Sequence, residues 1–155
     1  MSRADKIVAQ RERDAIDAQK AANEAARDAM RHEREDAWQR VLAELGPATE
    51  SLESRDWPGA RTLTLERRTF FGYKKYTRAG REVLNYEQPW KDGALTVRVY
   101  LLSDGRLAMT SLTSTMAINK GALEHVLNGD AFWGSLPIEA VSEGLRSIAA
   151  EGQPA

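Results

Sequence analysis

The feature that most constrains this chain is the uneven distribution of its large apolar side chains. Residues of the AVILMFWYC set occupy 65 of the 155 positions, or 42%. Of these 65 residues 23 are Ala, which leaves 42 bulky apolar residues. Residues 1–45 hold 9 of the 42 bulky apolar residues, and residues 46–155 hold the other 33. The length predicts about one domain, and only the second stretch is able to build a core. Residues 1–45 have too few bulky apolar side chains to form a core of their own.

Residues 3–45 predict one long helix. They contain neither Gly nor Pro and include 11 Ala, the residue with the highest helix propensity. Ser2 and Asp5 have the spacing of an N-terminal cap, and Gly46-Pro47 is typical of a helix end. We therefore expect four parts: a helical arm at 1–46, a connector at 47–60, a small α+β domain at 61–152 and a tail at 153–155.

Small apolar residues recur along this helix in alternating steps of three and four, interrupted by Arg11. Together they form a predicted partner-helix seam: Val8, Ala15, Ala18, Ala22, Ala25 and Ala29. Burying a methyl group contributes only about 0.8 kcal/mol, so the seam is weak per turn. It favours self-association or a partner helix, and the alternative is a solvated charged helix without a partner. A second apolar patch predicts docking on the following domain: Trp38, Val41, Leu42 and Leu45.

Beyond residue 60, alternating polar and apolar residues predict a small sheet. The clearest strand is 94–102, which Asp104-Gly105 turns into a strand at 106–113. Further strands are expected from 62 to about 70, at 73–77 and at 82–87, with Ala79-Gly80 as a hairpin turn.

Two helices complete the predicted fold. One spans 120–127 with Asn119 as its cap, and the other follows Ser135 and carries Ile138, Val141, Leu145 and Ile148 at helical spacing. The fold class is therefore α+β: a long N-terminal α-helix, a four- to five-stranded, mostly antiparallel sheet, and two C-terminal helices.

A basic-aromatic segment between residues 67 and 81 is the second candidate site. Cations can neutralise phosphates while aromatic rings stack on unpaired bases, so the segment suggests binding of RNA or single-stranded nucleic acid. An acidic protein partner could use the same residues. The structural alternative is a strand pair whose aromatics face the core and whose basic stems protect its edge. The residues are Arg67, Arg68, Phe71, Tyr73, Lys74, Lys75, Tyr76, Arg78 and Arg81.

Charge is balanced overall but not locally. The formal net charge is −1, which gives no general attraction to nucleic acid or anionic lipid. Residues 61–81 carry a net charge of +6 and residues 82–155 a net charge of −4, so these two parts either neutralise each other or leave a basic surface.

Signals for chemistry are sparse. The chain has no cysteine and two histidines, His32 and His125, neither of which lies in a recognised metal or catalytic motif. We therefore expect no metal and no cofactor, and an enzyme of unknown class is only a third reading. No apolar run approaches the roughly 20 residues that span a bilayer, so no membrane contact is expected. The charged N-terminus and the lack of cysteine favour the cytoplasm.

The first interpretation is thus a non-catalytic protein-protein interaction module that uses its N-terminal helix as an association arm. Nucleic-acid binding through residues 67–81 is the alternative. The partner is a second protein or a second copy of the chain.

Overall fold

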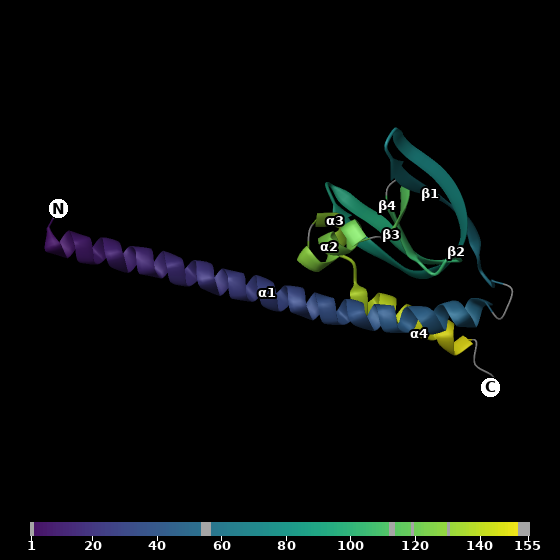
Figure 1. Ribbon diagram of the computed structural model, residues 1–155, viewed down its shortest axis with the longest axis horizontal. Helices are drawn as coiled ribbons and strands as arrows, with labels where there is room; N and C mark the ends of the chain where they lie inside the picture. Colours follow the sequence, from purple (N-terminus) through teal and green to yellow (C-terminus); the bar gives the residue numbers. More distant parts are fainter. Residues whose placement is uncertain (1, 54–56, 112–113, 119, 130, 152–155) are drawn as a thin grey trace.

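The protein consists of a long helix, a closed five-stranded sheet and a group of C-terminal helices (Figure 1). The computed structural model describes residues 2–53, 57–111, 114–118, 120–129 and 131–151. The predicted α+β class, with its long first helix and mostly antiparallel sheet, is confirmed.

Helix α1 spans Arg3–Glu53 and is 51 residues long. Its N-terminus has the predicted cap: the Asp5 amide donates to Ser2 Oγ at 3.1 Å, and the Ser2 amide and hydroxyl donate to Asp5 Oδ2 at 3.0 and 2.7 Å. These bonds satisfy backbone groups that a helix N-terminus otherwise leaves open.

The predicted end of this helix at Leu45 is wrong, because α1 continues through Gly46 and Pro47 to Glu53. A proline inside a helix loses one hydrogen bond and clashes with the residue before it. Gly46 has no Cβ to add to that clash, and Ala48 and Leu52, beyond the proline, are buried at 0% and 2% exposure. Tertiary packing of this last stretch therefore outweighs the local preference of Gly-Pro to end a helix.

The five strands pair in the order β1-β2-β3-β4-β5 and close into a small barrel. Neighbouring strands are antiparallel, and the sheet is closed by a parallel contact between Leu65 of β1 and Thr115 of β5. The bounds are β1 Arg61–Thr69, β2 Gly72–Trp90, β3 Gly93–Leu102, β4 Leu107–Ser111 and β5 Ser114–Ala117.

One predicted hairpin is correct and another is displaced. Asp104-Gly105 connects β3 and β4, and the Leu102 amide donates to the Arg106 carbonyl at 2.8 Å. Ala79-Gly80, however, is not a turn, because the 19-residue strand β2 passes straight through it. A Cβ on Gly80 would lie 2.5 Å from Leu63 Cδ1, so this glycine permits close packing of the barrel interior. The chain turns instead at Phe70-Phe71, between β1 and β2.

The C-terminal helices are α2 Lys120–Asn128, the one-turn α3 Ala131–Gly134 and α4 Ile138–Glu151. The predicted cap Asn119 lies outside the described residues. The four apolar residues of α4 predicted at helical spacing are buried, and α4 lies alongside the C-terminal part of α1 (Figure 1). Ion pairs join the two helices, one between Arg40 and Glu139 and one between Arg146 and Glu44 at 3.1 Å.

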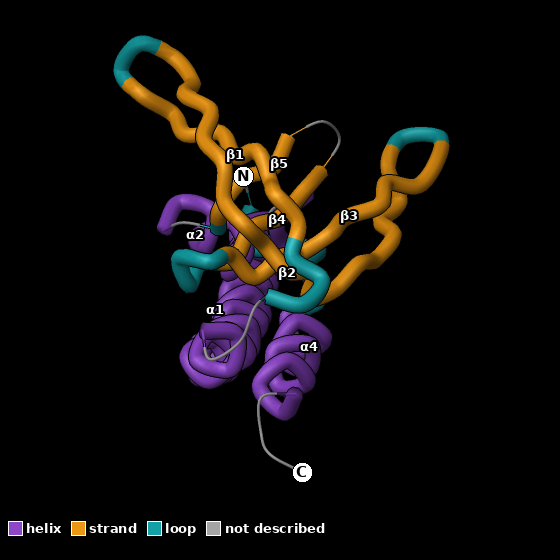
Figure 2. Tube along the Cα trace, turned by 90° about the vertical axis from the view of Figure 1, so that its right-hand side faces the viewer, coloured by secondary structure: helices purple, strands orange, loops and turns teal. Residues whose placement is uncertain are grey.

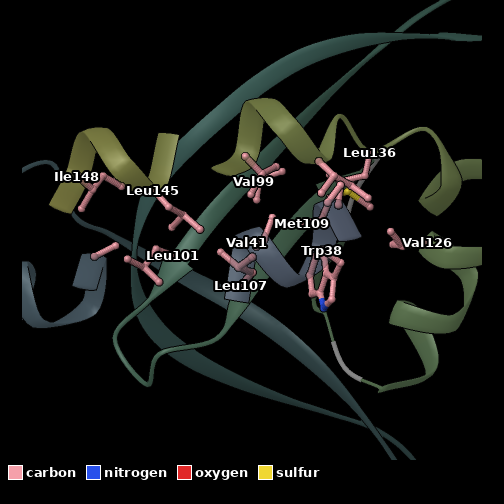
Figure 3. Close-up of a cluster of buried hydrophobic side chains, with 14 of the residues drawn as sticks. Trp38, Val41, Val99, Leu101, Leu107, Met109, Val126, Leu136, Leu145 and Ile148 are labelled. Atoms are coloured by element: carbon pink, nitrogen blue, oxygen red, sulfur yellow. The ribbon is translucent and has the colours of Figure 1, made fainter. Parts of the chain in front are cut away.

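Two apolar clusters stabilise this arrangement. The larger one lies between the sheet and the helices and includes Trp38, Val41, Val99 and Leu145 (Figure 3). The smaller one consists of strand residues alone: Leu63, Leu65, Tyr100, Leu102 and Ala108. Leu42, predicted to dock with Trp38 and Val41, is instead 45% exposed. The C-terminal half of α1 thus contributes to the main core, and its N-terminal half does not.

Candidate functional site

The N-terminal half of α1 projects away from the rest of the molecule (Figure 1). Residues 2–30 are exposed, apart from the half-buried Ala9. At 1.5 Å per residue, the segment 3–30 extends about 42 Å. We call residues 3–30 the arm.

The arm begins where two arginines attach α1 to the C-terminal helices. Arg31 donates to Asn128 and pairs with Glu124 at 3.1 Å. Arg34 donates to the carbonyls of Val126 and Gly134 at 3.2 and 2.5 Å. These contacts fix the direction in which the arm leaves the domain.

All six residues of the predicted seam lie on the arm and are exposed. Val8 is 54% exposed, so the seam is not used within the chain. A second apolar line was missed: Ile16 and Met30, at 54% and 57% exposure, lie two heptads apart on a neighbouring face. The heptad position between them is Asn23 and the one before Ile16 is Ala9, so the line has no clear heptad signal.

The basic-aromatic segment forms the hairpin of β1 and β2, which extends away from the helices (Figure 2). Phe70 and Phe71 form its turn and are each 96% exposed. Their rings meet edge to face, with centroids 5.2 Å apart and planes at 86°. Phe70 is not among the predicted contact residues of this segment.

The hairpin has two faces that carry different residues. Cross-strand partners share a face, so Arg67 and Lys74 lie on the face of the buried Leu65, and Tyr73 lies on the other face. Tyr73 is 68% exposed, while Tyr76, opposite Leu65, packs against the strand cluster. The four aromatics of the segment therefore do not form one stacking surface.

On the Leu65 face, the hairpin and its neighbours enclose a groove of about 740 Å³. Its lining includes apolar side chains, four cationic side chains and one carboxylate. The lining residues are Glu66, Arg67, Lys74, Tyr76, Arg78, Arg106, Met116 and Ala117. The last three were not predicted, because they come from strands distant in the sequence.

A polar network around Tyr76 occupies part of this groove. Arg106 donates to the Tyr76 hydroxyl at 3.1 Å, and the guanidinium carbons of Arg78 and Arg106 lie 5.2 and 5.9 Å from the ring centroid. Asp104 accepts from Arg106 at 2.6 Å and pairs with Arg78 at 3.6 Å. Partial burial opposes ionisation of Asp104, but its hydrogen bonds from Arg106 outweigh that effect and lower its pKa.

The acidic C-terminal part neutralises little of the basic segment. Among the described residues, two ion pairs join them: Arg78 with Asp104, and Arg81 with Glu151 at 2.6 Å. Arg67, Lys74 and Lys75 are exposed, and the side chain of Arg68 lies outside what is described. The basic residues of 61–81 thus largely face solvent.

The described part of the chain contains no group of three or more His, Cys, Asp or Glu side chains that could hold a metal ion. Within the same residues, every helix is too short or too polar to cross a bilayer. No protein-family model, no curated protein and no solved structure matches the chain.

Proposed function

We propose that this protein is a non-catalytic assembly module that pairs with a second copy of itself through the arm. The observation that carries the proposal is the exposure of all six seam residues on a helix that continues about 42 Å beyond its own domain. A helix that serves only the fold has no need of such an extension, since the main core uses residues from Ala37 onward.

The charges of the arm favour a second copy as its partner. Residues 3–30 contain six basic and six acidic side chains, so two arms do not repel each other overall. The distribution is uneven, because 3–13 carries a net charge of +2 and 14–30 a net charge of −2. A parallel pair would place the two +2 stretches together, and an antiparallel pair avoids this repulsion.

An antiparallel pair that overlaps along the whole arm also aligns four of the six seam residues with one another. If residue 3 of one copy lies beside residue 30 of the other, Val8 comes to lie opposite Ala25, and Ala15 opposite Ala18. These are the complementary heptad positions expected at a helix–helix interface. Such a pair places the two domains at opposite ends of the joined arms.

The pair should be weak and concentration-dependent. Each buried methyl contributes about 0.8 kcal/mol, whereas association costs about 4–15 kcal/mol in lost freedom. Small side chains compensate in part, because they allow the helix axes to approach closely. The absence of cysteine suits a reducing compartment, and we propose that the assembly forms in the cytoplasm.

Sedimentation equilibrium over a range of concentrations tests the proposal. Ala15→Glu places a carboxylate at the centre of the seam of both copies and should weaken the dimer at least tenfold, because removing the two carboxylates from water costs more than about 1.4 kcal/mol. Ala9→Glu is the matched control, because Ala9 lies at least about 100° around the helix from every seam residue. It should leave the dimer intact.

Two results would contradict the proposal. A wild-type protein that stays monomeric at all concentrations would show that the arm does not pair with a second copy. Equal weakening by Ala15→Glu and Ala9→Glu would show that association does not use the seam.

A further inference from the structure

We propose that the tip of the β1–β2 hairpin docks on an anionic phospholipid surface. The tip surface comprises Phe70, Phe71 and Tyr73, together with the cations Arg67, Lys74 and Lys75. The inference does not depend on pairing of the arms. Docking on a lipid surface requires no membrane-spanning helix.

The two phenylalanines have no role in the fold. Both rings are 96% exposed and contact each other rather than a core. Nor are they turn-forming residues, because tight hairpin turns favour Asn, Asp and Gly. The turn needs a positive φ at Gly72, where φ is 125°, and glycine adopts such an angle without strain. Adjacent exposed aromatics at the end of a projecting hairpin therefore indicate a binding surface.

The cations lie at the depth where lipid phosphates would be. Arg67 pairs with Lys74 in register, two pairs back from the closing pair Thr69 and Gly72, and Lys75 follows. At about 3.3 Å per residue, they lie roughly 7–10 Å behind the tip. An apolar surface that enters the bilayer interface is buried about 5–10 Å deep. The rings would thus reach the acyl boundary while the cations remain among the headgroups.

The cations also surround the tip instead of lining one side of it. Lys74 lies on the Leu65 face of the hairpin and Lys75 on the opposite face, and both are exposed. A planar anionic surface approached end-on can contact both faces at once. The negative surface potential of a cytoplasmic leaflet attracts such basic segments.

The ring geometry favours lipid over nucleic acid as the partner. Two rings at 86° cannot both lie parallel to the bases of one stack. Tyr76, the aromatic nearest the basic groove, already has two arginines against its ring. Insertion into an acyl boundary sets no requirement on the angle between the rings.

Co-sedimentation with vesicles tests this assignment, using the full chain and either phosphatidylcholine alone or phosphatidylcholine mixed with phosphatidylglycerol. The wild type should bind the mixed vesicles and bind pure phosphatidylcholine much more weakly, with affinity falling as salt is raised. Phe70→Ala combined with Phe71→Ala should weaken binding to the mixed vesicles by about tenfold or more per ring. Lys74→Ala combined with Lys75→Ala should weaken it by about fivefold per cation.

The matched control is Ile16→Ala combined with Met30→Ala, which removes two exposed apolar side chains from the arm instead. This variant should bind as the wild type does. All four substituted apolar residues are exposed, so unfolding curves should confirm that the variants keep their stability.

Three results would overturn the assignment. The first is a wild type that does not bind the mixed vesicles. The second is a phenylalanine variant that binds as well as the wild type or the control. The third is tighter binding to a single- or double-stranded oligonucleotide than to the vesicles at the same salt, which would assign the hairpin to nucleic acid.

Discussion

Gly144 lies where α4 packs against Val83 of β2, and replacing it tests that contact. A Cβ at this position would lie 2.6 Å from the carbonyl oxygen of Val83 and 2.7 Å from Val83 Cγ1. Val83 sits at the register shift between Glu82 and Leu84, where β2 departs from regular pairing with β3. Because the nearest atom belongs to the backbone, a side-chain rotation cannot relieve the overlap.

Two opposing effects set the magnitude for Gly144→Ala. Replacing Gly by Ala inside a helix gains about 1 kcal/mol in propensity. Forcing a methyl group into a packed contact costs about 1–3 kcal/mol, and more where the backbone must shift. We expect the steric cost to win, with a net loss of about 1–2 kcal/mol in the free energy of unfolding and a melting temperature lower by roughly 2–8 °C.

Urea unfolding followed by tryptophan fluorescence measures this loss, since the chain has four tryptophans. Ser147→Ala is the control, because it also raises helix propensity in α4 but at an exposed position. It should be neutral or slightly stabilising. If Gly144→Ala proved as stable as the wild type, α4 would not approach β2 as closely as described.

Two further predictions concern Pro47 and Asp104. Pro47→Ala restores a backbone donor inside α1 and should stabilise the protein by about 1–3 kcal/mol in urea unfolding; a loss of stability would mean that the helix is interrupted there. Asp104→Asn should destabilise it by about 1 kcal/mol near neutral pH, because the charged hydrogen bonds to Arg106 are lost. Since the folded-state pKa of Asp104 is lowered, this contribution is present above the unfolded value near 3.8 and disappears as the pH falls through the lower folded-state value. Wild type and variant should therefore converge in stability in strong acid, and a difference that stayed constant with pH would contradict this role for the carboxylate.

Several parts of the fold could be predicted because the local signal and the tertiary outcome agree. The cap formed by Ser2 and Asp5, the turn at Asp104-Gly105 and the apolar face of α4 are of this kind. In each case the residues that set the backbone conformation also suit the surrounding structure.

The incorrect predictions arise where packing overrides local preference. Gly46-Pro47 is a typical helix end, but the apolar spacing continues across it through Ala48 and Leu52, and burial of these residues prevails. The spacing of these apolar residues therefore already indicates, in the sequence, a helix that extends beyond Pro47. Ala79-Gly80 is a typical turn sequence, but Gly80 lies within β2 and lets Leu63 pack closely against that strand.

The candidate surfaces were predictable to different degrees. The helix of the arm could be predicted from its alanine content and its lack of Gly and Pro, and the seam from the spacing of its apolar residues. The boundary of the arm at residue 30 could not, because it depends on the contacts of Arg31 and Arg34 with the C-terminal helices. The basic groove could not be predicted either, since Arg106 and Met116 reach it only through the pairing of β4 and β5 with the rest of the sheet. Phe70 could not be assigned to the tip until the position of the turn was known.

The most direct test of arm pairing is the distance between identical positions in the two copies. The natural chain has no cysteine, so Lys6→Cys and Asp17→Cys each provide a single site for a spin label. In the antiparallel pair, the two labels at residue 6 are offset by about 32 Å along the arm axis and those at residue 17 by about 1.5 Å. Pulsed electron–electron double resonance should therefore give a clearly longer distance at residue 6 than at residue 17. Equal distances at the two sites would indicate a parallel pair, and the absence of dipolar coupling at both would show that the arm does not pair with a second copy.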